Sequence, residues 1–145
     1  MNNTITPQTA QELKNYYHFR WKMLREPWLQ PQGSEQDELE QQSTHLMTVV
    51  DEQVVAVGRM HKTSQTSGQI RYMAVSDSMQ GTGLGKAMVN ALELAASKQG
   101  VTEISLKARE SAVNFYQKLG YQSQGFSHLL YNEIRHFTMT KVINK

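Results

Sequence analysis

The stretch QGTGLGKAM, residues 80–88, places three glycines within five positions and a lysine directly after the last of them. It follows an apolar run, QIRYMAV at 69–75, and opens a pattern of apolar residues spaced three and four apart that ends before Gly100. Glycine costs roughly 0.5–1 kcal/mol relative to alanine within regular structure. Three glycines between a strand and a helix therefore require a reason, which is either the backbone angles of the turn or a bound group.

Two glycine-rich phosphate-binding motifs do not fit this spacing. The dinucleotide fingerprint G-x-G-x-x-G requires its third glycine where Lys86 stands. The P-loop G-x-x-x-x-G-K-S/T requires a glycine at Gln80 and a hydroxyl at Ala87. Two interpretations remain: a helix N-terminus whose unpaired N–H groups and dipole favour an anion such as a diphosphate, or a plain strand-to-helix turn.

The rest of the chain alternates between strand and helix patterns around this stretch. Residues 4–7 predict a first strand with Thr6 as the N-cap of a helix that runs to Arg25, and SEQDELEQQ at 34–42 predicts a second, short helix. Further strands are expected at 45–51, 54–62, 69–75, 102–108, 121–131 and 134–142, with helices at 84–99 and 111–119. The order β-α-α-β-β-β-α-β-α-β-β predicts an α/β protein with a mixed sheet and helices on both sides.

The composition excludes several classes of protein. A length of 145 residues suits a single domain, 1–145, and a formal net charge of +2 is too small to indicate nucleic-acid binding. The sequence has no cysteine, which excludes disulfides and thiolate metal sites and fits a cytoplasmic protein. No apolar run is long enough to cross a membrane, and the first residues lack the pattern of a signal peptide, so neither insertion nor secretion is expected.

Several segments carry a resemblance to a known family. MAVSDSMQGTGLGKAMVNALE at 73–93 resembles motif A of the GNAT (Gcn5-related N-acetyltransferase) family, whose loop Q/R-x-x-G-x-G/A is matched by Gln80, Gly83 and Gly85. SAVNFYQKLGY at 111–121 is similar to the family's F-Y-x-x-x-G-F/Y helix end, and EIRHFTM at 133–139 and LREPWLQPQGSEQDE at 24–38 resemble segments of a subgroup of small bacterial members. The resemblance implies the acyl-CoA N-acyltransferase fold, with a central twisted and mostly antiparallel sheet, and transfer of an acetyl group from acetyl-CoA.

The resemblance also implies which residues bind coenzyme A. The loop would hold the diphosphate through backbone N–H groups with the Lys86 charge nearby, and the strand at 73–75 would pair its backbone with the pantetheine arm. The implied cofactor-binding residues are Met73, Ala74, Val75, Gln80, Gly81, Thr82, Gly83, Leu84, Gly85, Lys86, Asn114 and Tyr116. One position departs from the family pattern, because Arg109 stands where many members have an asparagine that contacts the arm. Whether Arg109 or Asn114 takes that role is left open.

Tyr116 matches the position of the family's general acid, which would protonate the departing thiolate, although a core tyrosine is the alternative. An N–H group of Val75 or Ala74 is implied as the donor to the thioester oxygen. QIRYMAV contains no carboxylate where many members carry a glutamate base, so the candidates for the base are His136, His45, Glu110, Glu133 and water. The five histidines have no metal-binding spacing, and no metal is expected.

The sequence thus predicts an N-acetyltransferase that acts on a primary amine of a small molecule or peptide, with no nucleic-acid or membrane partner. The acidic segment SEQDELE at 34–40 would suit a cationic amine. Two other functions stay open, namely acetylation of protein N-termini or lysines and a CoA-binding regulatory module without turnover. A homodimer is also left open, and the sequence does not identify the acceptor.

Overall fold

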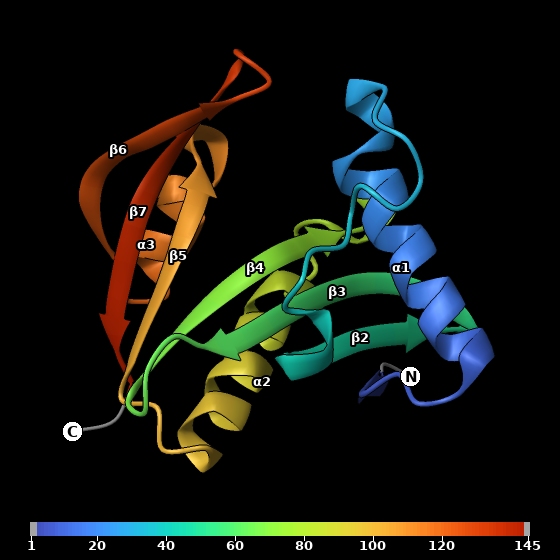
Figure 1. The fold of residues 1–145 in the computed structure, drawn as a ribbon, viewed down its shortest axis with the longest axis horizontal. Helices are drawn as coiled ribbons and strands as arrows, with labels where there is room; N and C mark the ends of the chain where they lie inside the picture. Colours follow the sequence, from blue (N-terminus) through green and yellow to red (C-terminus); the bar gives the residue numbers. More distant parts are fainter. Residues whose placement is uncertain (1–2, 144–145) are drawn as a thin grey trace.

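The computed structural model describes residues 3–143, which form one seven-stranded sheet with helices on both faces (Figure 1). The strands are β1 (Asn3–Ile5), β2 (Thr44–Val50), β3 (Gln53–Lys62), β4 (Ser67–Val75), β5 (Glu103–Arg109), β6 (Gln122–Leu130) and β7 (Ile134–Val142). The α-helices are α1 (Ala10–Leu24), α2 (Leu84–Lys98) and α3 (Val113–Lys118). The predicted class, a mixed and mostly antiparallel sheet between helices, is confirmed.

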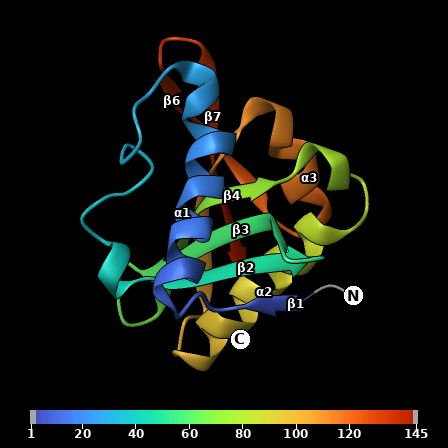
Figure 2. The ribbon, with the colours of Figure 1, turned by 90° about the vertical axis from the view of Figure 1, so that its right-hand side faces the viewer.

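The strand order is β1-β2-β3-β4-β5-β7-β6, and each neighbouring pair is antiparallel except β4 and β5. Parallel neighbours need a crossover connection, and α2 supplies it. Figure 2 shows α1 on one face of β2, β3 and β4, with α2 on the opposite face. This crossover places the glycine-rich stretch between the end of β4 and the start of α2.

Each face of the sheet has its own apolar core. The larger core joins α2 and α3 to the sheet and includes Met88, Leu92, Ile104 and Met139, all of them buried. The smaller core lies under α1 and comprises Tyr16, Met47, Val57 and Ala74, with partly buried side chains around them. Successive strand residues alternate between these cores, as the pleat requires. α1 and α2 are therefore fixed to opposite faces of the β2–β4 half of the sheet.

β4 and β5 pair only along their first residues and then separate. The pairing runs from Ser67↔Glu103 to Ile70↔Leu106, whereas β4 continues to Val75 and β5 to Arg109. Figure 1 shows the two strands diverging, with β5 turning away together with β6 and β7. The edge of β4 that faces β5 is thus left without a strand partner beyond residue 70.

A β-bulge in β4 marks the point of separation. Against β3, the register passes from Arg59↔Arg71 to Val57↔Ala74, so β4 contains one residue more than β3 over this interval. Tyr72 lies in the bulge with a φ of 58°, in the left-handed region that is uncommon for a tyrosine. A bulged strand bends and twists more strongly than a regular one. The bulge therefore accounts for the direction in which β4 leaves β5.

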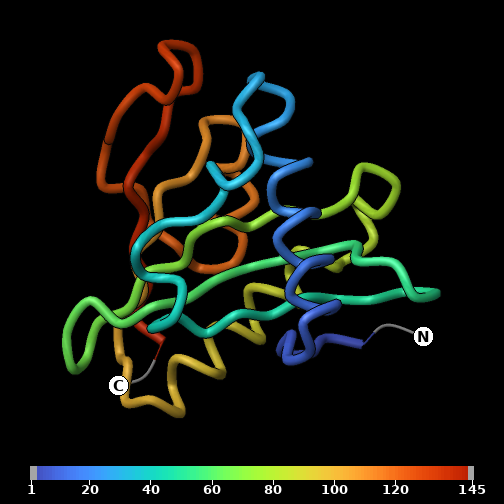
Figure 3. The backbone as a smooth tube through the Cα atoms, turned by 45° about the vertical axis from the view of Figure 1, so that its right-hand side comes forward, coloured from blue at the N-terminus to red at the C-terminus, as the bar shows by residue number. Residues whose placement is uncertain are grey.

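The predicted second helix at 34–42 is wrong. The segment forms turns that end in a single 3₁₀ turn, Glu40–Gln42, and Figure 3 shows it descending from the end of α1 to the start of β2. Its one apolar residue is Leu39, which gives a helix no apolar face to pack. Two of its carboxylates point inward instead: Asp37 and Glu40 each lie 2.7 Å from Arg59 Nη1, and the Arg59 guanidinium is fully buried. Buried ion pairs fix this segment, because an unpaired guanidinium there would be costly.

The N-cap of α1 is Thr9 and not the expected Thr6. The Thr9 hydroxyl accepts a hydrogen bond from the Glu12 N–H at 3.1 Å, and the Glu12 carboxylate accepts one from the Thr9 N–H at 3.0 Å. This reciprocal capping box needs a glutamate or glutamine three residues after the cap. Only Thr9 has one, since the residue three positions after Thr6 is Thr9 itself.

Candidate active site

A cavity of about 530 Å³ lies where β4 and β5 separate, and its size suits a small ligand. Its walls come from the end of α1, the bulge of β4, the end of β5, the start of α3 and the β6–β7 hairpin. Of the predicted site residues, Met73, Tyr116 and His136 line it, and Arg109 does as well. Ala74, Val75, Asn114 and the loop residues 80–86 are outside its lining. The structure thus brings the predicted acid and one predicted base into one cavity and leaves the loop beside it.

The glycine-rich loop leaves the N-terminus of α2 without a side-chain cap. Gly81 and Gly83 have φ values of 79° and 90°, and a Cβ atom on either would meet no heavy atom within 4 Å. Gly83 is the N-cap, and the first turn of α2 contains no acidic residue. The first N–H groups of an α-helix have no acceptor within the helix, and the dipole adds positive charge there. The loop is therefore an open anion cradle, which suits a diphosphate.

Two other loop side chains bond within the loop and to β4. The Gln80 amide donates to the Val75 carbonyl oxygen at 3.3 Å, and the Thr82 hydroxyl donates to the Met79 carbonyl oxygen. Lys86 is exposed in the first turn of α2. These bonds hold the loop against the end of β4, so its N–H groups keep a fixed position relative to the unpaired edge of that strand.

An aromatic contact ties α3 to the start of α2. A Cβ atom on Gly85 would lie 3.1 Å from Phe115 Cζ, so the glycine allows the Phe115 ring to pack against the first turn of α2. The Phe115 ring in turn contacts the Tyr116 ring edge-to-face, with centroids 4.9 Å apart. Asn114 is exposed on α3 and is turned away from the cavity lining. The third glycine of the loop is thus required by packing, and that packing positions Tyr116.

Tyr116 is buried, yet its hydroxyl has no hydrogen-bond partner among residues 3–143. The side chain is 7% exposed and packs edge-to-face against Tyr121, with centroids 5.7 Å apart. Tyr121 shows the usual arrangement of a core tyrosine, because its hydroxyl donates to Glu93 Oε2 at 2.8 Å. Burial raises the pKa of Tyr116, so its phenol keeps its proton at neutral pH. Tyr116 is therefore a protonated donor that faces the cavity.

His136 presents an acceptor nitrogen in the same cavity. Its Nδ1 lies 3.0 Å from the Ile134 carbonyl oxygen, and because a carbonyl only accepts, Nδ1 carries the hydrogen and Nε2 the lone pair. Its ring stacks on His128 at a centroid distance of 4.6 Å. Burial lowers the pKa of His136, and the charge of Arg109 lowers it further. The imidazole is thus neutral at pH 7 and available to take a proton.

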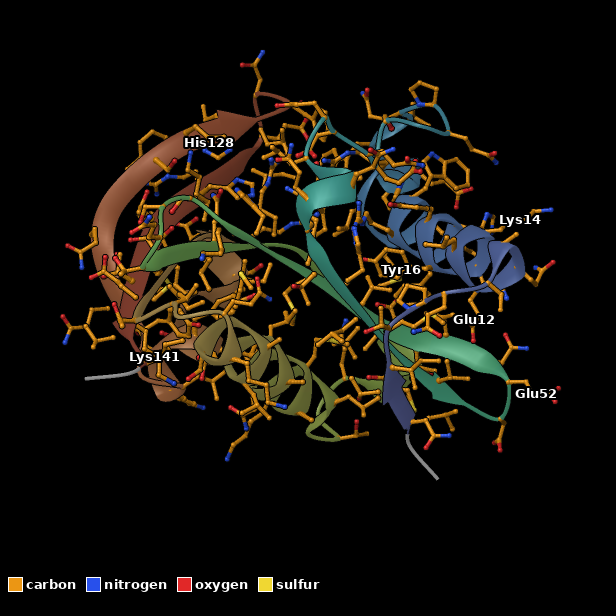
Figure 4. All side chains as sticks on the ribbon, turned by 60° about the horizontal axis from the view of Figure 1, so that its bottom comes forward. Glu12, Lys14, Tyr16, Glu52, His128 and Lys141 are labelled. Atoms are coloured by element: carbon orange, nitrogen blue, oxygen red, sulfur yellow. The ribbon has the colours of Figure 1, made fainter. Side chains whose placement is uncertain are left out.

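The other candidate bases do not line the cavity. Both ring nitrogens of His45 are engaged, Nδ1 with the Tyr16 hydroxyl at 2.8 Å and Nε2 with the Glu40 carbonyl oxygen at 2.6 Å. Figure 4 shows Tyr16 between α1 and the sheet. Glu110 is exposed and pairs with Arg135 at 2.9 Å, and Glu133 is exposed in the β6–β7 turn. His136 is the protein group from the sequence-based set whose position fits a base.

Strand pairing brings His128, which the sequence did not single out, beside His136 and Arg109, which it did. His136 on β7 lies directly opposite Arg109 on β5 and His128 on β6, so the three side chains share one face of the sheet. Figure 4 places His128 on this strand pair. Further charged or aromatic lining residues that the sequence did not single out are Arg25, Arg71, Tyr72 and Lys107. The alternation of 107 and 109 along a strand was visible in the sequence, but the insertion of β7 between β5 and β6 was not.

The described part of the chain lacks two kinds of feature, a metal-binding group and a membrane-spanning helix. Among residues 3–143, no three histidine, aspartate or glutamate side chains are grouped so that they could hold a metal ion. No helix in that range is long and apolar enough to cross a membrane.

Comparison with known sequences identifies the family. Residues 5–143 match the model of the acetyltransferase (GNAT) domain. The uncharacterized N-acetyltransferase YjcF of Bacillus subtilis strain 168 is 29% identical over 137 residues, covering 94% of this chain and 97% of that protein. The uncharacterized protein YyaT of the same strain is 34% identical over 111 residues, covering 75% of this chain and 72% of that protein.

Solved structures share the fold. An aminoglycoside 6'-N-acetyltransferase complexed with coenzyme A superposes with a TM-score of 0.82 at 16% identity, covering 100% of this chain and 98% of that one. Ard1 from Thermoplasma volcanium superposes with a TM-score of 0.83 at 16% identity, covering 99% of each chain. Since the family model spans nearly all of the chain and the fold is the same, this protein belongs to the GNAT family of acetyltransferases.

Proposed function

We propose that the protein transfers the acetyl group of acetyl-CoA to a primary amine of a small molecule or peptide, by direct attack of the amine. The observation that carries this proposal is the cavity between β4 and β5, because Tyr116 and His136, whose imidazole is neutral, both line it. A protonated phenol and an unprotonated imidazole are the acid and the base that such a transfer requires.

The chain's own groups fit coenzyme A as the acetyl donor. The uncapped N-terminus of α2 and the open space at Gly81 and Gly83 suit the diphosphate, with Lys86 adding positive charge. The β4 edge, unpaired with β5 beyond residue 70, offers backbone groups to the pantetheine arm along Met73, Ala74 and Val75. When bound, acetyl-CoA supplies the acetyl group as an activated thioester.

Three groups then act on the reacting atoms. His136 Nε2 takes the proton that the amine loses, directly or through one water. The N–H of Val75 or Ala74 donates to the thioester oxygen, where negative charge develops. The Tyr116 hydroxyl gives its proton to the departing sulfur. Burial raises the pKa of Tyr116 above the ordinary value of about 10, so the phenol is a weak acid at neutral pH and gives its proton only as the thiolate forms.

Release of CoA thiol with a panel of amines, amino acids and peptides tests this function. We expect amine-dependent thiol release together with a product heavier by one acetyl group. A panel that contains protein N-terminal peptides and lysine peptides separates small-molecule from protein acetylation. Tight acetyl-CoA binding without turnover on any amine would contradict the proposal and favour a CoA-binding regulatory module.

Replacing Gly83 with valine is expected to weaken CoA binding at least tenfold, or about 1.4 kcal/mol, with the fold retained. A side chain at this position enters the open cradle, and a β-branched residue does not adopt a φ of 90° without strain. Isothermal titration calorimetry with CoA measures the change. Gly125→Val is the matched control, because Gly125 also has a positive φ and no heavy atom within 4 Å but lies on β6. Equal CoA affinity in folded Gly83→Val and wild type would remove the loop from the site.

A further inference from the structure

The cavity between β4 and β5 is lined by positive and potentially positive side chains. They are Arg25, Arg71, Lys107, Arg109, His128 and His136. None of the described residues that line the cavity is an aspartate or a glutamate. A cavity with this lining favours a negatively charged ligand and disfavours a cationic one.

Two of these cations lack the partner that every other arginine has. The chain contains six arginines, and Arg20, Arg59, Arg71 and Arg135 each lie within 3.2 Å of a carboxylate oxygen. No hydrogen bond or ion pair joins the half-buried Arg109 guanidinium to any of residues 3–143, and no carboxylate there pairs with Arg25. Both residues line the cavity.

The two guanidiniums without a carboxylate partner also affect each other. Burial lowers the pKa of Arg109, and the positive charge of Arg25 lowers it further. Arg25 is held in place, because its Nε donates to the Ser34 carbonyl oxygen at 3.1 Å and its guanidinium lies 5.5 Å from the centre of the Tyr72 ring. Two like charges near each other in a half-buried position are unfavourable unless an anion binds between them.

The acidic segment that would have suited a cationic amine contributes no residue to the lining of this cavity, although Asp37 pairs with Arg71, which lines it. Asp37 and Glu40 are bound to buried arginines, and the Glu35 carboxylate accepts hydrogen bonds from the Gly33 N–H and the Gln36 amide. None of these three acids lines the cavity. The expectation that segment 34–40 selects a cation is therefore not supported, and the charge at the cavity has the opposite sign.

We propose that the amine acceptor of this enzyme carries a negatively charged group, a carboxylate or a phosphate, that binds to Arg25 and Arg109. This inference rests on the proposed acetyl transfer. The phosphates of CoA do not account for these cations, because no residue of the loop at 76–86 lines the cavity. A guanidinium pair matches the planar, bidentate geometry of carboxylate and phosphate oxygens.

Matched acceptors test the charge preference. Glycine, β-alanine and aminomethylphosphonate are compared with glycinamide and β-alaninamide, and rates are expressed per concentration of neutral amine. We expect kcat/KM to be at least tenfold higher for the anionic member of each pair. Comparing aminomethylphosphonate with glycine then shows whether the site prefers a phosphate-like group or a carboxylate. Higher kcat/KM for the neutral amides would overturn the inference while leaving acetyl transfer intact.

Variants test the two residues. Arg109→Gln and Arg25→Gln should each lower kcat/KM at least tenfold for the anionic acceptor, leave the neutral amide unchanged, and leave the KM for acetyl-CoA unchanged. Arg109→Lys should retain part of the activity, since lysine keeps the positive charge but cannot form the two parallel hydrogen bonds of a guanidinium. Lys14→Gln is the charge-matched control, because Lys14 is exposed on α1 and points away from the sheet (Figure 4). Thermal melts verify that each variant is folded.

The outcomes separate this inference from the proposed function. A rise in the KM for acetyl-CoA in Arg109→Gln, with acceptor discrimination unchanged, would assign Arg109 to the pantetheine arm and overturn the inference. If no amine is acetylated, the inference is tested by the change in melting temperature that the anionic amines cause in the presence of CoA. Stabilisation by the amino acids that is lost in both arginine variants supports an anion site, and no stabilisation in wild type overturns it.

Discussion

Tyr116→Phe is expected to lower kcat about 10²-fold, within the usual range for removal of a general acid. The substitution keeps the ring, so its contacts with Phe115 and Tyr121 remain. The melting temperature should change little, because the hydroxyl has no partner among residues 3–143 that the change would leave unpaired. CoA affinity should also change little, since the proton is transferred only in the transition state.

Tyr121→Phe is the matched control for this variant. Tyr121 is 2% exposed and lies beside Tyr116, but its hydroxyl donates to Glu93. We expect its loss to destabilise the fold by about 1–2 kcal/mol through the broken hydrogen bond, with turnover nearly unchanged. Thermal melts and kinetics on the same preparations distinguish the two tyrosines. A Tyr116→Phe enzyme with wild-type kcat would assign the acid role to water or another group.

His136→Gln is expected to lower kcat/KM by about 10²-fold at neutral pH and to change the shape of its pH profile. Burial holds the pKa of His136 below its ordinary value of 6.5. The imidazole is therefore neutral above pH 6.5 and becomes protonated as the pH falls through its lowered pKa. In that range a plot of log(kcat/KM) against pH should have a slope of two for wild type, because both the amine and His136 take up a proton. The variant should have a slope of one, from the amine alone.

Glu110→Gln provides the control for the base assignment. Glu110 was an alternative candidate from the sequence, but it is exposed, pairs with Arg135 and is outside the cavity lining. We expect its kcat/KM to stay within about twofold of wild type, since surface ion pairs contribute little. A steep loss of activity in Glu110→Gln, together with an unchanged pH profile in His136→Gln, would contradict the role given to His136.

Local sequence was sufficient for the elements whose signals are local. Runs rich in strand-forming residues predicted the strands, and the three-and-four spacing predicted α2. The family motif predicted the fold class and the acetyltransferase family, because the glycine loop needs its residues at fixed spacing within one turn. The roles of Gly83 and Tyr116 in that motif stay predictions.

The second helix was mispredicted because the conformation of residues 34–42 depends on residues that are distant in the sequence. Helix-forming side chains at 34–42 favoured a helix locally, but Arg59 on β3 and Arg20 on α1 bind Asp37 and Glu40. Two buried guanidiniums without counter-charges would cost far more than the few tenths of a kcal/mol per residue that helix propensity provides. The ion pairs therefore decide the path of this segment.

The sequence by itself determined the loop, the strands around it and the family, since each of these follows from residues close together in the chain. Only the tertiary structure decided the charge of the cavity and which of the candidate bases lines it, namely His136. Arg25, Arg109 and His136 come from α1, β5 and β7, and the register of β7 between β5 and β6 brings the last two together. Strand pairing between distant segments depends on the packing of the whole sheet, and no local pattern specifies it.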